Sequence, residues 1–390
     1  MYFAVGNCLN SKPKTQNPKL RKLVPLLLAW FSANARDLPW RRTRDPYAIW
    51  VSEIMLQQTQ VKTVIPFWER WLRELPTIES AAKASSAKIH KLWEGLGYYT
   101  RVRNLQKAAQ RIVVECRRRG NESQIENKLE TPHVVSYKFP ENFDDVLALP
   151  GIGRYTAGAI CSIAFNQPTP ILDGNVIRVL TRIFGIGENP KEKTTNGKLW
   201  KLAEELVQNS NGNRSHLNQS LMELGALVCT PRSPKCLICP VKKLCVAFKE
   251  KRTEELPNLG KRATATARTF FAFVIERDGK FLVQQRPAGI VNAKLWEFPN
   301  FETNGENKDA KEIFASAFNF KTVKFQPLCT IRHSITRYRM TLEAFHVRLK
   351  NSPKKLAGIW LSPKEFDSLA FSSAHKKLAS AAAKSILSGR

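Results

Sequence analysis

No apolar run in this 390-residue sequence is long enough to cross a membrane. The longest lies near Leu23–Phe31 and is interrupted by Pro25, whereas a membrane-spanning helix needs about 20 apolar residues. Met1–Asn10 also lacks the apolar centre of a signal peptide. We therefore expect a soluble intracellular protein, in the cytoplasm or nucleoid if the source is bacterial.

Acidic residues are scarce: 33 Asp and Glu stand against 62 Lys and Arg, which gives a formal net charge of +29. Such a field favours polyanions over neutral small molecules. Ribosomal and membrane-surface proteins are basic too. Because 43% of the residues are hydrophobic and the charge is spread along the chain, we favour a folded nucleic-acid-binding protein over one with a basic tail.

Four of the eight cysteines lie within residues 229–245, with six, two and five residues between successive members. So dense a group in a reducing compartment indicates a metal or cluster site rather than a disulfide framework. Zinc is the commoner ligand of four cysteines, and a [4Fe–4S] cluster also suits such a set. The four residues are Cys229, Cys236, Cys239 and Cys245.

Apolar residues at helical spacing predict a largely helical region, followed by a region of strands. Helices are expected over Pro18–Asn34, over two segments between Pro46 and Leu75, over Ala82–Trp93, over Leu105–Arg119 and over Gly174–Phe184. Strands are expected over Thr269–Glu276, Lys280–Gln285, Thr322–Ile331 and Arg339–Leu349, with helices over Ala310–Phe318 and Ser372–Leu387.

These expectations divide the chain into four parts. A flexible segment, residues 1–17, precedes an all-α domain over residues 18–248 that includes the cysteine loop at 229–245. A charged linker over residues 249–268 then leads to an α+β domain over residues 269–390.

The turn Leu149–Gly153 separates two helical runs and contains Gly151 and Gly153. The helix that follows it offers free N–H groups and a positive dipole end to a phosphate. Asp173 stands at the head of the next helix, where capping is its commoner role and is compatible with catalysis.

Glu53 is the one acid between Asp45 and Glu69, within an apolar helical run. A lone helical Glu is most often solvated. Apolar surroundings would raise its pKa, however, as a general acid working near neutral pH requires.

These segments resemble the helix-hairpin-helix DNA glycosylases, and more narrowly the MutY-type adenine DNA glycosylases. The resemblance rests on LPWR at 38–41, PYAIWVSEIMLQQTQV at 46–61, WEGLGYYTRVRNL at 93–105, LPGIGRYTAGAI at 149–160 and ILDGNVIRVL at 171–180. It continues to the cysteines and so covers roughly residues 20–250.

The resemblance implies hydrolysis of an N-glycosidic bond after base flipping. Glu53 would protonate adenine, and Asp173, supported by Tyr155 and Asn175, would stabilise the cationic sugar. Related lyases carry a nucleophilic lysine where this chain has Tyr155, so a monofunctional enzyme is expected. Gln219 would read the adenine edge. The other implied DNA contacts are Trp40, Arg41, Leu56, Gln58, Thr59, Tyr98, Arg101, Gly151 and Gly153.

The six-two-five cysteine spacing is that of the iron–sulfur glycosylases, so the resemblance favours a structural [4Fe–4S] cluster over zinc. The second domain resembles the Nudix-like carboxy-terminal domain of MutY proteins, above all at LWEFPNFE, 295–302. True Nudix hydrolases carry a glutamate-rich magnesium helix, whereas Lys308–Phe318 has only Asp309 and Glu312. The domain is therefore expected to bind rather than to hydrolyse.

The family's Phe-Ser-His loop, which contacts 8-oxoguanine, is replaced here by Ile335, Thr336 and Arg337, preceded by Ser334. Thr336 keeps a hydroxyl and Arg337 keeps a donor. The expected partner is double-stranded DNA with adenine opposite 8-oxoguanine or guanine, bound by a monomer. Three alternatives stay open: a thymine or uracil mismatch glycosylase, a nonenzymatic iron–sulfur DNA sensor and a nucleotide-pool hydrolase, the last disfavoured by the missing glutamates.

Overall fold

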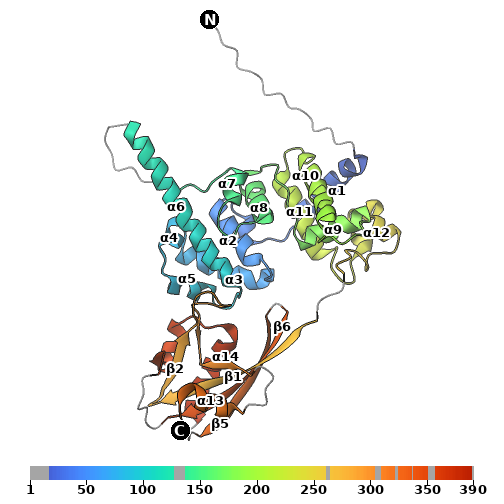
Figure 1. Ribbon diagram of the computed structural model, residues 1–390. Coiled ribbons are helices and arrows are strands. Elements are labelled where there is room, and N and C mark those ends of the chain that lie inside the picture. Colours follow the sequence, from blue (N-terminus) through green and yellow to red (C-terminus); the bar gives the residue numbers. More distant parts are fainter. Residues whose placement is uncertain are drawn as a thin grey trace. The chain divides into compact units, whose positions relative to one another are not determined.

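The computed structural model describes residues 17–126, 137–260, 264–303, 309–320, 324–335, 337–349 and 356–388. Packing groups these residues into two compact units (Figure 1). The first unit lies within Met1–Gln58 and Arg111–Lys261, and the second within Thr59–Gln110 and Arg262–Arg390. The limits expected from the sequence follow the chain rather than the packing and stay a prediction.

The first unit is helical and is built around one apolar core. Its helices bring leucines and valines to this core at spacings of three and four residues, as in Leu20, Leu23 and Leu27. Its elements are α1 (Pro18–Asn34), η1 (Pro39–Arg41), α2 (Pro46–Leu56), α7 (Phe143–Leu147), α8 (Arg154–Phe165), α9 (Gly174–Phe184), α10 (Lys193–Gln208), α11 (Arg214–Leu227), η2 (Cys236–Ile238), η3 (Lys242–Leu244), α12 (Val246–Lys249) and the later part of α6 (Thr100–Glu126).

The second unit begins with three short helices and the first part of α6. They are α3 (Val61–Glu74), α4 (Ile78–Lys83) and α5 (Ser86–Trp93). Trp71 and Trp93 pack edge to face with their ring centroids 5.8 Å apart, which joins α3 to α5. The single helix expected over Ala82–Trp93 is therefore wrong. The helix stops at Lys83 because the Ser85 side chain caps a new one by accepting a hydrogen bond from the Lys88 N–H.

The rest of the second unit is a mixed sheet with a helix packed on each face. Side chains of β1 alternate between two cores: Ala272 and Val274 join Leu378 of α14, whereas Phe273 and Ile275 join Phe314 of α13. The strands are β1 (Thr266–Arg277), β2 (Lys280–Gln285), β3 (Trp296–Glu297), β4 (Asn300–Glu302), β5 (Phe325–Ile335), β6 (Tyr338–Arg348) and β7 (Ile359–Leu361), with α13 (Ala310–Phe318), η4 (Pro363–Ser368) and α14 (Ser373–Ser388).

The central strand β1 pairs with β6 in parallel and with β2 in antiparallel fashion, which gives the order β3-β2-β1-β6-β5. The turn Asp278-Gly279 joins β1 to β2 with both residues at positive φ, as a tight hairpin turn requires. The expected α+β architecture is confirmed.

Several expected bounds are confirmed without change, namely those of α1, α9, α13 and β2. The expected helix Leu105–Arg119 is longer in the structure and runs from Thr100 to Glu126. No helix in the described part of the chain has the length and apolar character needed to cross a membrane.

The close packing of α8 against Pro170 predicts that adding a methyl group at Gly158 destabilises the fold. A Cβ on Gly158 would lie 2.2 Å from the Pro170 carbonyl oxygen. We expect Gly158→Ala to lower the free energy of unfolding by about 2 kcal/mol or more in urea titrations. Gly197→Ala is the matched control, because Gly197 of α10 is exposed and has nothing within 4 Å of its added Cβ. That control should stabilise the chain by about 0.5–1 kcal/mol, and equal effects would contradict the packing argument.

Candidate active site

The carboxyl group of Glu53 is buried at the centre of the first unit. Glu53 lies in α2, all of which is buried except its first and last residues, and only 4% of Glu53 is exposed. The Tyr155 hydroxyl, from the first turn of α8, donates a hydrogen bond of 2.7 Å to Glu53 Oε2. Two residues 102 positions apart in the sequence thus share one polar contact inside an apolar region.

The environment of Glu53 favours its protonated form. Burial raises its pKa, the Tyr155 hydrogen bond lowers it, the nearby Asp173 raises it and Arg41 lowers it, and the balance brings the pKa to about 7. A carboxylic acid with such a pKa holds a proton that it can donate near neutral pH. The Tyr155 pKa lies well above its ordinary value, because burial and the two neighbouring carboxyl groups disfavour a phenolate.

Asp173 caps α9 and faces the same region. The Val176 N–H donates to Asp173 Oδ1 at 2.7 Å, and the Asn175 side-chain amide donates to Asp173 Oδ2 at 2.9 Å. Burial raises the Asp173 pKa, while these donors and Arg178 oppose the rise. The capping role expected of Asp173 is confirmed, and its second carboxylate oxygen is held by Asn175.

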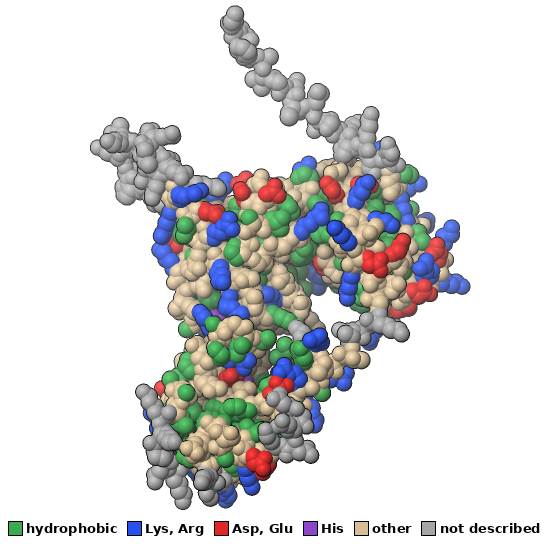
Figure 2. Space-filling model, in the orientation of Figure 1, with side chains coloured by type: hydrophobic (Ala, Val, Ile, Leu, Met, Phe, Trp, Pro, Cys, Tyr) green, Lys and Arg blue, Asp and Glu red, His purple; other side chains and the backbone are tan. Residues whose placement is uncertain are grey.

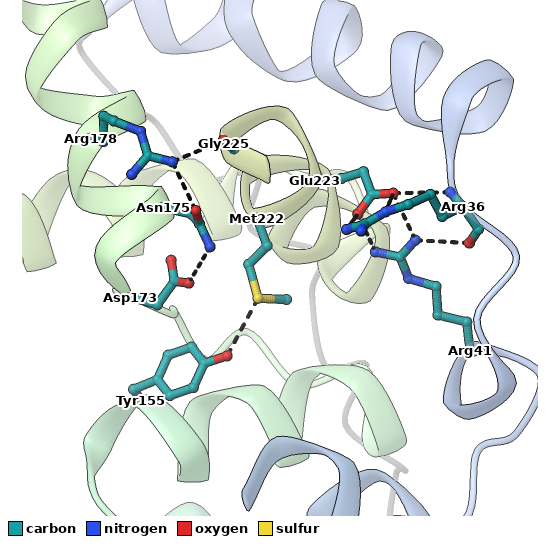
Figure 3. A network of polar contacts seen from close by, with 9 residues as sticks. All are labelled: Arg36, Arg41, Tyr155, Asp173, Asn175, Arg178, Met222, Glu223 and Gly225. Carbon is teal, nitrogen blue, oxygen red and sulfur yellow. Dashed lines mark hydrogen bonds and ion pairs between the residues drawn. The ribbon is translucent and has the colours of Figure 1, made fainter. Parts of the chain in front are cut away.

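Arg178 of α9 fixes Asn175 in turn, as Figure 3 shows. One nitrogen of its guanidinium group donates to Asn175 Oδ1 at 2.8 Å and to the Gly225 carbonyl oxygen at 2.9 Å. Its Nε donates to the Cys229 carbonyl oxygen at 2.7 Å. A Cβ on Gly225 would lie 2.6 Å from the Asn175 Cβ, so α11 and α9 approach closely where they hold the amide.

A helix-hairpin-helix motif precedes Tyr155. Helix α7 ends before a turn in which Gly151 has φ +78°, a conformation that favours glycine, and α8 begins after Gly153. No side chain caps the start of α8, so its first N–H groups and its positive dipole end suit an anion. Both glycines are exposed.

An ion-pair cluster beside this site was missed by the sequence reasoning. Glu223 of α11 is 1% exposed and accepts hydrogen bonds of 2.7 Å from both Nε and Nη2 of Arg36. Arg41 donates to the same two oxygens, to Oε2 at 2.9 Å and to Oε1 at 3.2 Å. Burial raises the Glu223 pKa, yet these hydrogen bonds outweigh it and bring the pKa to about 2. Figure 3 draws this cluster at Glu223 of α11, together with the Asp173–Asn175–Arg178 network, which reaches the same helix at Gly225.

One signal for Glu223 was available in the sequence. It lies four residues after Gln219, on the same helical face, inside a run of otherwise apolar positions. The partner Arg36 carries no comparable signal, because it lies 187 residues away.

The other residues expected at the site occupy varied settings in the first unit. Gln219 is buried and its amide donates to Ser215 Oγ at 3.1 Å, along its own helix. Trp40 is 6% exposed, whereas Leu56 is half-buried. Gln58 is exposed with φ +56°, in the left-handed region. Their roles toward DNA stay a prediction.

In the second unit, Tyr98 lies on an exposed loop held by Arg101. Tyr98 is 42% exposed and adopts φ +48° between Gly97 and the start of α6. The Arg101 guanidinium lies 5.4 Å from both the Trp93 and Tyr98 ring centroids. It also reaches Thr59 Oγ1 at 3.4 Å. Burial lowers the Arg101 pKa to about 10.

The expected lesion-recognition loop is the tip of the β5–β6 hairpin. Ser334 and Arg337 are exposed there, and Ile335 pairs with Tyr338. Arg337 donates to the Tyr338 hydroxyl at 3.0 Å and stacks over its ring. Thr336 lies outside the described residues.

The four clustered cysteines line one cavity with Arg182 and Val241. The buried Arg182 donates to Cys229 Sγ at 3.4 Å, so a positive charge stands ready for anionic thiolates. In the described part of the chain, no group of three or more His, Cys, Asp or Glu side chains suits a single metal ion. Four thiols around one shared cavity are a ligand set that a multi-iron cluster can use.

The cluster loop also supports α9. Val246 of α12 packs against Gly185 at the end of α9, where an added Cβ would lie 2.5 Å from a Val246 methyl group. The Cys245 thiol contacts the Arg182 carbonyl oxygen at 3.4 Å. Residues of the cysteine loop therefore contact the carboxy-terminal end of α9, whereas Asp173 caps its amino-terminal end.

Basic side chains are spread widely over the surface seen in Figure 2, and acidic ones are fewer. Such a surface suits contact with phosphates through many weak charges.

Three family models match the chain. A model of HhH-GPD superfamily base excision DNA repair proteins matches residues 51–205, and a NUDIX domain model matches residues 271–381. The iron-sulfur binding domain of endonuclease III matches residues 229–245. These matches confirm the expected fold class, an iron–sulfur cluster and DNA as the binding partner, whereas the four cysteines as the cluster's ligands stay a prediction.

Solved and curated proteins agree with these models. The chain resembles the solved structure of a thermostable thymine-DNA glycosylase, at 30% identity and a TM-score of 0.50, over 60% of this chain and 97% of that one. The adenine DNA glycosylase of Buchnera aphidicola (subspecies Schizaphis graminum) is 38% identical, over 71% of this chain and 74% of its own. The adenine DNA glycosylase of Rattus norvegicus is 34% identical and is covered over 76% of its length. The match with that relative covers 90% of the present chain, and the chain therefore belongs to the adenine DNA glycosylase family of base excision repair proteins.

Proposed function

We propose that the chain is a monofunctional DNA glycosylase that flips adenine out of the duplex, where it is mispaired with 8-oxoguanine or guanine, and hydrolyses its N-glycosidic bond. The observation that carries this proposal is the buried Glu53 carboxyl, held by Tyr155 with a pKa of about 7. The family membership supports adenine as the base that is removed.

Glu53 is the proposed proton donor. Adenine leaves poorly as an anion, so a proton on its ring lowers the barrier to cleavage. The Tyr155 hydroxyl occupies one Glu53 oxygen and so orients the other toward the base. Positioned general acids contribute roughly 10²–10⁴-fold to a rate.

Asp173 is the proposed stabiliser of the positive charge that develops on the sugar as the bond breaks. The carboxylate accepts two hydrogen bonds, from Val176 and Asn175, and these favour its ionised form. The pair thus divides the work by environment. Glu53 accepts one hydrogen bond, from Tyr155, and keeps its proton, whereas the donors around Asp173 oppose the rise in its pKa that burial causes and so favour its anion.

Two further features fit hydrolysis at a flipped base. Tyr155 stands where related lyases carry their lysine nucleophile, so no amine is placed there to form a Schiff base. The Arg36–Glu223–Arg41 cluster adds fixed charges and donors beside the site, suited to the polar edge of a purine. We infer that Gln219 contributes to the same recognition after leaving Ser215.

Contacts with the opposite base are assigned to the β5–β6 hairpin tip. Ser334 and Arg337 are exposed donors there, and Thr336 supplies a hydroxyl in sequence. Tyr98, with Gln58, would fill the space left in the base stack. The cluster, when bound by Cys229, Cys236, Cys239 and Cys245, supplies a structural cross-link near the DNA-binding surface. We infer that the protein acts as a monomer.

Single-turnover cleavage tests the substrate. Duplexes with adenine opposite 8-oxoguanine, guanine, cytosine or thymine are incubated with the protein, and alkali then reveals abasic sites. We expect alkali-dependent breaks at adenine, fastest opposite 8-oxoguanine. Release of thymine from a guanine mispair instead would favour the activity named for the structurally similar thymine-DNA glycosylase.

Glu53→Gln removes the acidic proton and leaves the size and shape of the side chain almost unchanged. We expect the rate constant for base release to fall by at least about 10²-fold, with the dissociation constant for DNA nearly unchanged. Glu69→Gln, at an exposed position of α3, is the control and should behave as the unmodified protein. Turnover by Glu53→Gln near the unmodified rate would remove Glu53 from its role.

The pH dependence follows from the Glu53 pKa of about 7. Glu53 loses its proton above that value, so the rate constant should fall about tenfold per pH unit at higher pH. The free energy of unfolding also falls as the pH rises from 4.5, the ordinary pKa of Glu53, to about 7, its pKa in the folded protein, because the unfolded chain releases this proton more easily. Glu53→Gln should therefore gain about 3 kcal/mol relative to the unmodified protein between pH 4 and pH 8 in urea titrations. Parallel stability curves would contradict a buried, protonated Glu53.

The cysteine loop predicts the effect of losing one ligand. Cys236→Ser should lose most of its bound iron and lower the free energy of unfolding by about 3 kcal/mol or more, measured by metal analysis and thermal unfolding. Cys116→Ser, at a half-buried cysteine of α6 outside the loop, is the control. A variant at Cys236 that is free of iron, stable and fully active would overturn the structural role.

A further inference from the structure

Glu94 joins the end of α5 to the carboxy-terminal sheet, and both lie in the second unit. Its side chain is 5% exposed. One oxygen accepts a hydrogen bond of 2.9 Å from the Phe371 N–H, and the other accepts from Lys376 Nζ at 2.6 Å and from Lys91 Nζ at 2.9 Å. These bonds lower the Glu94 pKa against the effect of burial, which raises it.

On the sheet side of this contact, Phe371 is fixed by several interactions with the sheet. Phe371 forms a parallel bridge with Trp296, and the Trp296 N–H donates to the Ala370 carbonyl oxygen at 2.9 Å. The Phe371 ring stacks on that of Phe298. Lys376 lies in the first turns of α14, which packs on the sheet. A second hydrogen bond connects the same two segments, because Lys91 Nζ also donates to the Leu369 carbonyl oxygen at 2.9 Å.

The helical side of the contact leads directly to Tyr98. Glu94 is followed by the loop Gly95–Tyr98, in which Gly95, Gly97 and Tyr98 all have positive φ. Trp93 Nε1 donates to the Gly97 carbonyl oxygen at 3.1 Å, and Arg101 donates to the same oxygen at 3.1 Å. A loop in so constrained a backbone shape depends on the position of its first residue.

We propose that Glu94 is a positioning residue that couples the carboxy-terminal sheet to the Gly95–Tyr98 loop, so that recognition of the opposite base by the sheet domain favours insertion of Tyr98 into the duplex. This coupling rests on the proposed function for its substrate. Its structural part, the control of the loop by Glu94 and Lys376, can be tested on the free protein.

Lys376→Met is the informative variant. The Lys376 side chain is 51% exposed, and its removal leaves Glu94 with Lys91 and the Phe371 N–H, so the fold is retained. Among the described residues, Lys376 Nζ bonds Glu94, 282 residues away in sequence, and no residue of the loop, so an effect on the loop passes through Glu94. Glu94→Gln is the second variant and weakens all three bonds together.

Lys83→Met is the matched control. Lys83 of α4 pairs with Glu79 at 2.6 Å, its side chain is 65% exposed, and its loss removes the same single charge from the same unit. It differs from Lys376 in that its partner belongs to its own helix.

Hydrogen–deuterium exchange on the free protein is the first measurement. We expect the peptide spanning residues 93–99 to exchange about five-fold faster in Lys376→Met and faster still in Glu94→Gln, with Lys83→Met unchanged. A peptide from α9, in the first unit, should not respond. Unchanged exchange at residues 93–99 in both variants would overturn the proposal, whatever the substrate.

Single-turnover release is the second measurement. The ratio of the rate constants opposite 8-oxoguanine and opposite guanine should fall about five-fold in Lys376→Met, with little change opposite guanine. Equal slowing of both substrates, or an unchanged ratio, would overturn the coupling. Absence of adenine release by the unmodified protein would instead defeat the proposed function, and the exchange result would still decide the role of Glu94.

Discussion

A carboxyl group buried among apolar side chains is the constraint on which the first unit depends. Buried Glu53 cannot form hydrogen bonds with water, so its carboxyl group needs a partner within the protein. That partner, the Tyr155 hydroxyl, comes from another helix. That requirement places the start of α8 against α2. The hairpin turn before α8 and the close approach of Gly158 to Pro170 hold this arrangement. The raised pKa of Glu53 is the direct result.

Rigid support for the second carboxylate comes from further away. Arg178 and Arg182 both lie on α9 and point to the cysteine loop, one through the Cys229 carbonyl oxygen and the other through its sulfur. A cluster bound there would therefore restrain the helix that Asp173 caps. The cysteine loop and Asp173 are therefore joined through α9, and the role proposed for the cluster is structural. This is how a structural metal site can affect activity without touching the substrate.

Sequence reasoning reached features that depend on local patterns. Periodicity placed α1 and α9, the density of Cys229 to Cys245 indicated a metal or cluster site, and the isolation of Glu53 in an apolar run indicated a buried acid. The choice of an iron–sulfur cluster over zinc came from the family resemblance. Sequence reasoning missed the Arg36–Glu223–Arg41 cluster, because residues nearly two hundred positions apart leave no local mark. It also missed the Ser85 cap and could not foresee that residues 59–110 pack with the carboxy-terminal sheet. Those outcomes depend on tertiary contacts.

The buried acids of the Nudix-like carboxy-terminal domain are held by basic partners. Among its described residues, the buried carboxylates are Glu276 and Glu297. Glu276 accepts hydrogen bonds from His346 and Arg348, and Glu297 is paired with Arg286. Burial lowers the His375 pKa to about 3, so this neighbour of Glu297 stays neutral and the ion pair with Arg286 stands alone. Carboxylates committed to such pairs are poor ligands for magnesium, which needs oxygen atoms free to coordinate it. The sheet thus uses its buried acids for stability, and the proposed contacts with DNA fall to its exposed hairpin tip.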